Sequence, residues 1–338
     1  MKRYQKIDLF RLLCAALVVL IHTVEVRNGH PYAYMLVTCF AGQAVPFFFI
    51  VSGFFLAKKL DTAPDPFGVL RKQVTHNLLL YAAWMVVELP GLIVTYTTRY
   101  PDASIVYYAT LLIRRVLLAG QGVYWFILIL AEALLISGLL LIRRKEKTLY
   151  ILAAVCMLLR VVYKTDLSFW GLGYLNKLFY IVFSWDNNVV MSGLPFVTIG
   201  IFFARNEKRL KISQGILAAG YGILGMVSVI LFFLAYRLRP DLIYLIIPGD
   251  LQAIVLFLIA LQPTGRSYSE RLCGNCRDLS TCLYYLHTIF IYNVANHTIG
   301  LHAPVLQRYA IAFLPPVLIW LIVQKLNWKP AKWMLSMR

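Results

Sequence analysis

Long apolar segments separated by short basic loops constrain this chain more than any other feature. Apolar runs of about 20 residues, the length of a helix that crosses a bilayer, recur along all 338 residues. Only 14% of the residues are charged, whereas soluble domains carry about 25%. We therefore expect an all-α integral membrane protein, in which residues 1–338 form one transmembrane bundle within a lipid bilayer.

The apolar runs predict a bundle of about ten transmembrane helices. The stretch 104–119 is also apolar but contains Arg114 and Arg115, so we expect an extra helix that lies in the outer interface. Segments 58–76 and 265–277 are predicted to be cytoplasmic loops. The predicted spans are residues 7–27, 35–57, 77–97, 122–142, 148–163, 187–204, 212–236, 242–262, 279–296 and 307–326.

The distribution of basic residues predicts the orientation of this bundle. The net charge is +18, and 22 of the 33 Lys and Arg residues lie in segments that the ten spans place inside. Such a bias follows the positive-inside rule and puts both termini in the cytoplasm. Because the basic residues are spread over short loops and not gathered on a soluble face, the charge does not indicate nucleic-acid binding.

A polar stripe runs along the first predicted helix. Each residue of an α-helix turns about 100° and rises about 1.5 Å, so Arg11 and His22 lie within about 20° of each other and about 16 Å apart along the axis. Asp8 falls on the same stripe. Ionisable groups within a membrane usually face a bundle interior or a wet cavity. The stripe therefore predicts a site that reaches from the cytoplasmic edge into the bilayer.

His22 has two interpretations. A histidine in a bundle can simply hydrogen-bond a neighbouring helix. Alternatively, Glu25 could hold one imidazole nitrogen and raise its basicity, and such a base takes the proton from a hydroxyl group that attacks a carbonyl. We favour the catalytic interpretation, with His22 as the base and Glu25 as its partner.

Arg11 also has two interpretations. It could form an ion pair with Asp8 three residues earlier, or recognise an anionic group such as a phosphate that enters from the cytoplasm. Both can hold at once if Asp8 orients Arg11. The basic residues of the next predicted cytoplasmic loop would add to such an anion site, although each also fits simple membrane topology. They are Lys58, Lys59, Arg71 and Lys72.

Further polar groups lie in or beside later spans. His287 is in the middle of the ninth span, Asn187 begins the sixth, and Trp125 belongs to an aromatic cluster that begins the fourth. Each could be structural, and an interfacial belt explains the aromatic cluster, but aromatic platforms also bind sugar rings. Cys273 and Cys276 form a single C-x-x-C, which is too few ligands for a zinc site. We expect no metal, and reduced thiols in a cytoplasmic loop.

Taken together and in order, these motifs resemble acyltransferase family 3, integral-membrane enzymes that include bacterial O-acetyltransferases of surface polysaccharides. Arg11 and His22 are similar to the family's Arg-x10-His signature. The other matches are FFFIVSGFFL in the second span for FF-x-x-SG-[FY], YWF at 124–126 for a W-[FY] helix start, LPFVTIGIFFAR at 194–205 for a Pro-Phe…Gly helix, and LSTCLYYLHTIFI at 279–291 for S-x-x-x-Y-L-x-H.

The resemblance implies an O-acyltransferase of the bacterial inner membrane. Acetyl-CoA or another acyl-CoA would be the co-substrate, and a hydroxyl group of an extracytoplasmic cell-envelope glycan or lipid-linked saccharide would be the acceptor. His22, with Glu25, would then be catalytic. We assign cofactor binding to Arg11, Ser52, Arg71 and Lys72, and substrate binding to Trp125, Asn187 and His287.

One departure from the family pattern suggests an alternative. Many members carry R-x-x-R before the third span, where this chain reads RKQVTHNLLLYAAW, without the spaced arginine pair. Divergent members resemble the membrane half of serine racemases from vancomycin-resistant bacteria, where the domain is linked to amino-acid uptake. The alternative function is therefore transport of a small solute such as serine.

Overall fold

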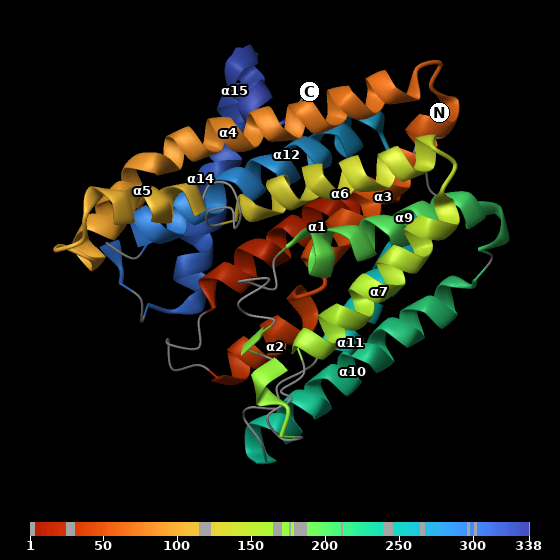
Figure 1. The fold of residues 1–338 in the computed structure, drawn as a ribbon, viewed down its shortest axis with the longest axis horizontal. Helices are drawn as coiled ribbons and strands as arrows, with labels where there is room; N and C mark the ends of the chain where they lie inside the picture. The colour runs from red at the N-terminus through yellow and green to blue at the C-terminus, as the bar shows by residue number, and fades with distance from the viewer. Residues whose placement is uncertain are drawn as a thin grey trace. The chain divides into compact units, whose positions relative to one another are not determined.

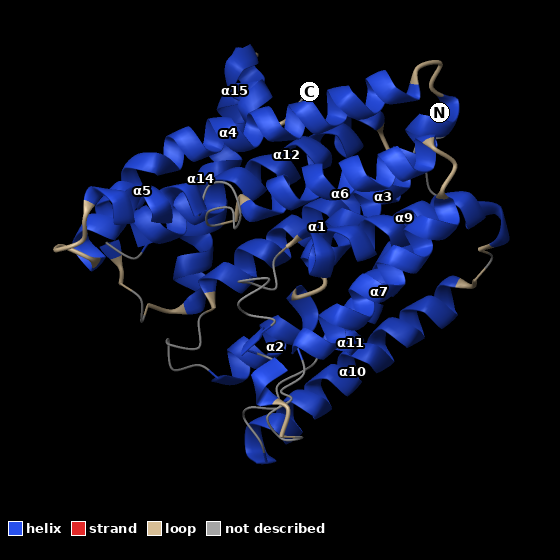
Figure 2. Ribbon diagram, viewed as in Figure 1, coloured by secondary structure: helices blue, strands red, loops and turns tan. Residues whose placement is uncertain are grey.

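The computed structural model describes every residue except 1–3, 25–30, 115–122, 165–170, 176, 179–187, 211, 239–245, 264–267, 296–297, 301–302 and 338. Every regular element in this described part is a helix, which confirms the expected all-α class (Figure 2). Contacts between Cα atoms divide the chain into two compact units. Unit 1 comprises Met1–Val51 and Asn206–Arg338, and unit 2 comprises Ser52–Arg205. The single bundle over 1–338 stays a prediction.

The helices are assigned to the units as follows, with α3 (Ala44–Thr62) shared between them. Unit 1 contains α1 (Gln5–Thr23), α2 (Pro31–Ala41), the 3-10 turn η5 (Glu207–Arg209), α10 (Gln214–Leu238), α11 (Ile246–Leu261), α12 (Glu270–Ile289), the π-helical segment η7 (Phe290–Ala295), α14 (Val305–Leu326) and α15 (Lys329–Met334). Unit 2 contains α4 (Pro66–Arg99), α5 (Ile105–Arg114), α6 (Trp125–Ile142), α7 (Glu146–Lys164), the π-helical segment η4 (Val189–Gly193) and α9 (Leu194–Asn206), whose last residue belongs to unit 1.

In unit 1, α1 lies along α12 over most of its length (Figure 1). The side-chain amide of Gln5 donates to the carbonyl of Tyr268, just before α12, over 2.7 Å. At the far end of α1, His22 meets His287, near the end of α12. The two helices therefore run parallel, so that equivalent ends of α1 and α12 stand together.

Helix α14 packs against both α1 and α12 and runs in the opposite direction. Near its C-terminal end, Gln324 hydrogen-bonds Asp278 in the first half of α12. Near its N-terminal end, the Tyr309 hydroxyl donates to the carbonyl of Ala16 over 3.3 Å. The N-terminal end of α14 therefore lies at the same end of unit 1 as the C-terminal ends of α1 and α12.

In unit 2, α4 lies along α6 (Figure 1). The ring of Tyr124, just before α6, stacks on Trp84 with centroids 5.3 Å apart. Further along the pair, Leu70 fills the space that a side chain on Gly138 would need. A small residue near the C-terminal end of α6 therefore allows the two helices to approach closely.

The start of α4 corrects the predicted loop at 58–76. Helix α3 continues to Thr62 and α4 begins at Pro66. The Asp65 carboxylate caps α4 by accepting from the Gly68 N–H over 2.9 Å, and proline is favoured at the first helical position. At 1.5 Å per residue α4 is about 51 Å long, which exceeds the ~30 Å hydrocarbon core. The predicted loop was wrong because a capped, basic segment forms the first turns of α4, ahead of its apolar part.

Two further boundaries differ from the sequence prediction. The second predicted span, 35–57, is interrupted at Gly42 and Gln43, between α2 and α3. The predicted loop 265–277 is wrong from Glu270 onward, because the Ser269 hydroxyl caps α12 by accepting from the Leu272 N–H over 3.1 Å. The charged first half of α12 therefore belongs to the helix and carries its side chains into unit 1.

Six helical stretches in the described residues are long and apolar enough to cross a membrane, which agrees with a multi-pass membrane protein. One of them joins α2 to α3 across the turn at Gly42 and Gln43, and another joins η4, α9 and η5. Helix α1, with Lys6, Asp8 and Arg11, is not among the six. Helix α5 confirms that the stretch 104–119 contains a short helix, while its interfacial position, the ten spans and the cytoplasmic termini stay predictions. The six are Leu36–Thr62, Pro66–Arg99, Trp125–Ile142, Val189–Arg209, Gln214–Leu234 and Val305–Leu326.

Candidate functional site

The parallel course of α1 and α12 brings two histidines together in unit 1. The ring centroids of His22 and His287 are 5.2 Å apart, and the rings are inclined by 44°. His287 is completely buried. His22 lies in the last turn of α1. The residue that the described part of the structure places against His22 is thus His287, which we had assigned to substrate binding.

The hydrogen bonds of His287 determine what its ring can do. Its Nδ1 lies 2.8 Å from the carbonyl oxygen of Leu283 and 3.0 Å from that of Tyr284. Because a carbonyl oxygen only accepts, Nδ1 must carry the hydrogen. In the neutral ring Nε2 then presents a lone pair, and this buried atom has no hydrogen-bond partner among the described residues. The ring is oriented as an acceptor for a proton or for a hydroxyl group.

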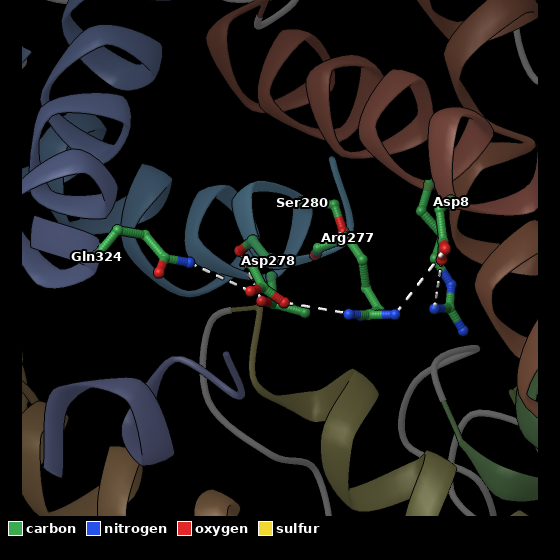
Figure 3. Close-up of polar contacts among 7 residues, drawn as sticks. Asp8, Arg277, Asp278, Ser280 and Gln324 are labelled. Atoms are coloured by element: carbon green, nitrogen blue, oxygen red, sulfur yellow. Dashed lines mark hydrogen bonds and ion pairs between the residues drawn. The ribbon is translucent and has the colours of Figure 1, made fainter. Parts of the chain in front are cut away.

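At the other end of the same helices lies a charged network (Figure 3). Asp8 on α1 contacts Arg11 over 3.4 Å and Arg277 on α12 over 3.9 Å. Arg277 also lies 3.7 Å from Asp278, whose other carboxylate oxygen accepts from the Gln324 amide on α14 over 3.2 Å. Two carboxylates therefore balance two guanidinium groups and tie three helices together.

The network bears on both interpretations of Arg11. The predicted i,i+3 ion pair with Asp8 is confirmed. Arg277 joins the same carboxylate but was missed, because we placed it in a loop. The sequence did contain a signal: Arg277 precedes His287 by ten residues, close to the spacing between Arg11 and His22. Since α1 is continuous, Arg11 and His22 stand about 16 Å apart along it, as predicted.

Four other predicted residues belong to unit 2, whereas the histidine pair belongs to unit 1. Arg71 and Lys72 are exposed in the second turn of α4, and Ser52 is half-buried on α3. Trp125 begins α6, half-buried, with its ring edge-on to Phe126 at 6.3 Å. Glu25 and Asn187, also predicted for the site, lie outside the described residues.

Unit 2 also contains an open hollow of about 1100 Å³, between the ends of α3, α6 and α9 and the starts of α4 and α7. Arg205 projects into it and pairs with Asp61 and, over 2.6 Å, with Glu146. The other cations of the lining give the hollow a positive balance. Its lining is Leu60, Asp61, Pro66, Leu141, Ile142, Arg144, Lys145, Glu146, Lys147, Thr148, Tyr150 and Arg205.

The cysteines are distributed differently from the sequence prediction. Cys273 and Cys276 are buried on α12 and do not lie in a loop, because the helix begins before them. All six cysteines are buried and none is in a disulfide bond. The part of the chain that the structure describes contains no group of three or more His, Cys, Asp or Glu side chains placed to bind a metal ion.

The chain is similar in sequence to racemases of enterococci. The chain is 26% identical to an amino-acid racemase of Enterococcus faecalis, over 96% of this chain and 46% of that protein. It is 23% identical to a serine/alanine racemase of Enterococcus gallinarum, over 91% of this chain and 43% of that protein. The chain thus spans slightly less than half the length of these curated relatives.

No solved structure matches the chain. The family described as "Acyltransferase domain" matches residues 4–324, which include α1, both histidines and the charged network. Since the match extends over nearly the whole chain, the motif resemblance is confirmed, and the chain belongs to acyltransferase family 3.

Proposed function

We propose that the protein is an O-acyltransferase of the bacterial inner membrane. It would move an acyl group, in the first instance acetyl, from cytoplasmic acyl-CoA to a hydroxyl group of an extracytoplasmic cell-envelope glycan. The observation that carries the proposal is the histidine pair, of which His287 is buried, in a chain that belongs to an acyltransferase family. A base beside a free hydroxyl is what acyl transfer to oxygen requires.

The chemistry follows from the orientation of the two rings. The acceptor hydroxyl attacks the thioester carbonyl and passes its proton to a ring nitrogen of His22 or His287. The tetrahedral adduct then expels the thiolate of CoA as the carbon–sulfur bond breaks, and the protonated imidazole returns the proton to that sulfur. The bond from Nδ1 of His287 to the backbone holds its tautomer, so that Nε2 stays available as the acceptor.

The remaining residues divide between donor and acceptor in this proposal. Arg11, at the charged end of α1, and Ser52, Arg71 and Lys72 in unit 2 bind the CoA part of the donor. The basic hollow of unit 2 would attract the same phosphates. Trp125 and Asn187 contact the sugar of the acceptor. Glu25 orients His22.

The test is transfer of labelled acetyl from acetyl-CoA to envelope glycan by the purified protein in nanodiscs. We expect His22→Ala to lower the rate by about 10²–10⁴-fold, the usual contribution of a positioned base. Leu13→Ala, an exposed position on the same helix, should leave the rate unchanged. Full activity of His22→Ala would overturn the assignment of His22.

The alternative function is transport of a small solute such as serine. Both are named as racemases of amino acids, and this chain corresponds to slightly less than half of each. A membrane half that supplies such an enzyme would carry a small amino acid such as serine across the bilayer. Uptake of labelled L-serine by proteoliposomes without acyl-CoA, together with no binding of CoA, would support this alternative over acyl transfer.

A further inference from the structure

Arg308, in the first turn of α14, is a completely buried cation with unmet hydrogen-bonding capacity. Its Nη1 donates to the carbonyl of Gly300 over 3.0 Å. Its Nε and Nη2 are buried and find no hydrogen-bond acceptor among the described residues. A guanidinium offers five N–H donors, and a buried charge is unfavourable unless it is paired. The neutral carbonyl of Gly300 does not balance the charge of Arg308, and no carboxylate among the described residues forms an ion pair with it.

The position of Arg308 along α14 adds to this imbalance. The aligned peptide dipoles of a helix place positive potential at its N-terminal end, where a cation is disfavoured and an anion is stabilised. Pro304, the residue before α14, provides no side-chain cap. The helix end and the guanidinium therefore favour the same occupant, a negatively charged group.

An apolar cluster shows which way Arg308 faces. The cluster joins α1, α12, η7 and α14 in the interior of unit 1, and its members are fully or almost fully buried. They are Ala15, Val19, Leu283, Ile291 and Ala312. Residues three or four positions apart lie on one face of a helix, so any residue at that spacing from a cluster member faces the same interior.

Arg308 and the two histidines all have this spacing. Arg308 precedes the cluster member of α14 by four residues, His287 follows that of α12 by four, and His22 follows Val19 by three. Because α14 runs opposite to α1 and α12, all three steps lead toward the same end of unit 1. The buried guanidinium and the histidine pair thus share one face at one end of these three helices.

We propose that Arg308 binds an oxyanion, such as a carboxylate, on the same molecule whose hydroxyl group meets the histidine pair. The planar fork of the guanidinium matches two oxygens of one carboxylate or phosphate. Resting on the proposed acyl transfer, this inference makes the acceptor an acidic molecule, for example a uronic-acid glycan, and Arg308 the residue that selects it. A phosphate-bearing acceptor has the same chemistry and is distinguished by the test.

The experiment compares matched probes on the protein in nanodiscs. Binding of D-glucuronate, D-glucose and inorganic phosphate is measured by calorimetry for the wild type, Arg308→Gln, Arg308→Lys and the control Gln307→Ala, an exposed neighbour. We expect the wild type to bind glucuronate or phosphate at least tenfold more tightly than glucose. Arg308→Gln should lose this preference, Arg308→Lys should keep part of it, and Gln307→Ala should keep all of it.

Two results would overturn the inference: equal binding of all three probes by the wild type, or an unchanged preference in Arg308→Gln. Thermal unfolding without probe checks that each variant is folded. If Arg308→Gln does not fold, Arg308→Lys decides, because it keeps the charge and loses the fork, and its preference should fall.

Acetyl transfer separates this inference from the proposed function. For a carboxylated acceptor, Arg308→Gln should raise KM at least tenfold with little change in kcat, which a merely structural role would not produce. Transfer that prefers neutral acceptors would overturn the inference and leave the acyltransferase standing. Anion binding that depends on Arg308, without any acetyl transfer, would support the anion site and overturn the proposed acyltransferase function.

Discussion

At the scale of single residues, Asp8 balances two arginines. Its carboxylate contacts Arg11 and Arg277 from two helices, and its side chain is only 10% exposed. Removing one member of a buried charge set leaves its partners uncompensated, which is more destabilising than the intact pair is stabilising. Asp8 is therefore the position where the network is most sensitive to a single change.

We predict that Asp8→Asn lowers the free energy of unfolding by about 1–3 kcal/mol, since both arginines retain some contact with water. The measurement is the thermal unfolding midpoint of the purified protein in detergent. Asp102→Asn, at an exposed turn, should change stability by less than about 0.5 kcal/mol. Equal midpoints for Asp8→Asn and the wild type would show that the network does not stabilise unit 1.

The polar stripe of α1 could be predicted from the sequence, whereas the residues of α12 that pair with it could not. Asp8, Arg11 and His22 follow from helical periodicity, which depends only on positions along one helix. His287 and Arg277 are recognisable as polar residues in an apolar chain, but their pairing with α1 depends on which helices pack together. Arg308 was missed because it lies at the very start of a span, where basic residues are common.

At the scale of elements, α3 and α9 approach each other closely at Gly53. A Cβ atom built on Gly53 would collide with the backbone of Val197 on α9. Backbone atoms cannot move aside as the end of a long side chain can. The glycine of the SG pair in FFFIVSGFFL is therefore required by the packing of these two helices within unit 2.

We predict that Gly53→Ala destabilises the protein by at least about 2 kcal/mol, because the added methyl group forces the helices apart. Gly222→Ala is the matched control. Gly222 lies within α10 with open space around its Cα, so alanine there should leave stability unchanged or raise it by up to about 1 kcal/mol. Unfolding midpoints in detergent test both; a Gly53→Ala variant as stable as the wild type would contradict the close approach.

At the scale of the whole molecule, the direction of the bundle rests on loop charge. The ten-span topology places Lys145 in the cytoplasm and Asp102 outside, and both positions are exposed. The native cysteines are all buried, so an introduced thiol can be followed against a low background.

We predict that a membrane-impermeant maleimide labels Asp102→Cys on intact cells, and labels Lys145→Cys only after lysis, because the positive-inside rule holds basic loops in the cytoplasm. Labelling of Lys145→Cys on intact cells would reverse the orientation. Equal labelling of both variants would change the number of spans between them, which the predicted topology sets at one.

The sequence by itself determined the all-α class, the membrane character, most helices, the stripe on α1 and the family, because apolar run length and helical period are local properties of the chain. Tertiary structure alone decided where helices extend beyond the apolar runs, as the caps at Asp65 and Ser269 do. It also decided that His287 lies against His22 and that Asp8 contacts two arginines. It buried Arg308 with N–H groups that find no acceptor among the described residues. The physical reason is that a buried polar group must find its partner across space, and that partner belongs to a helix distant in sequence.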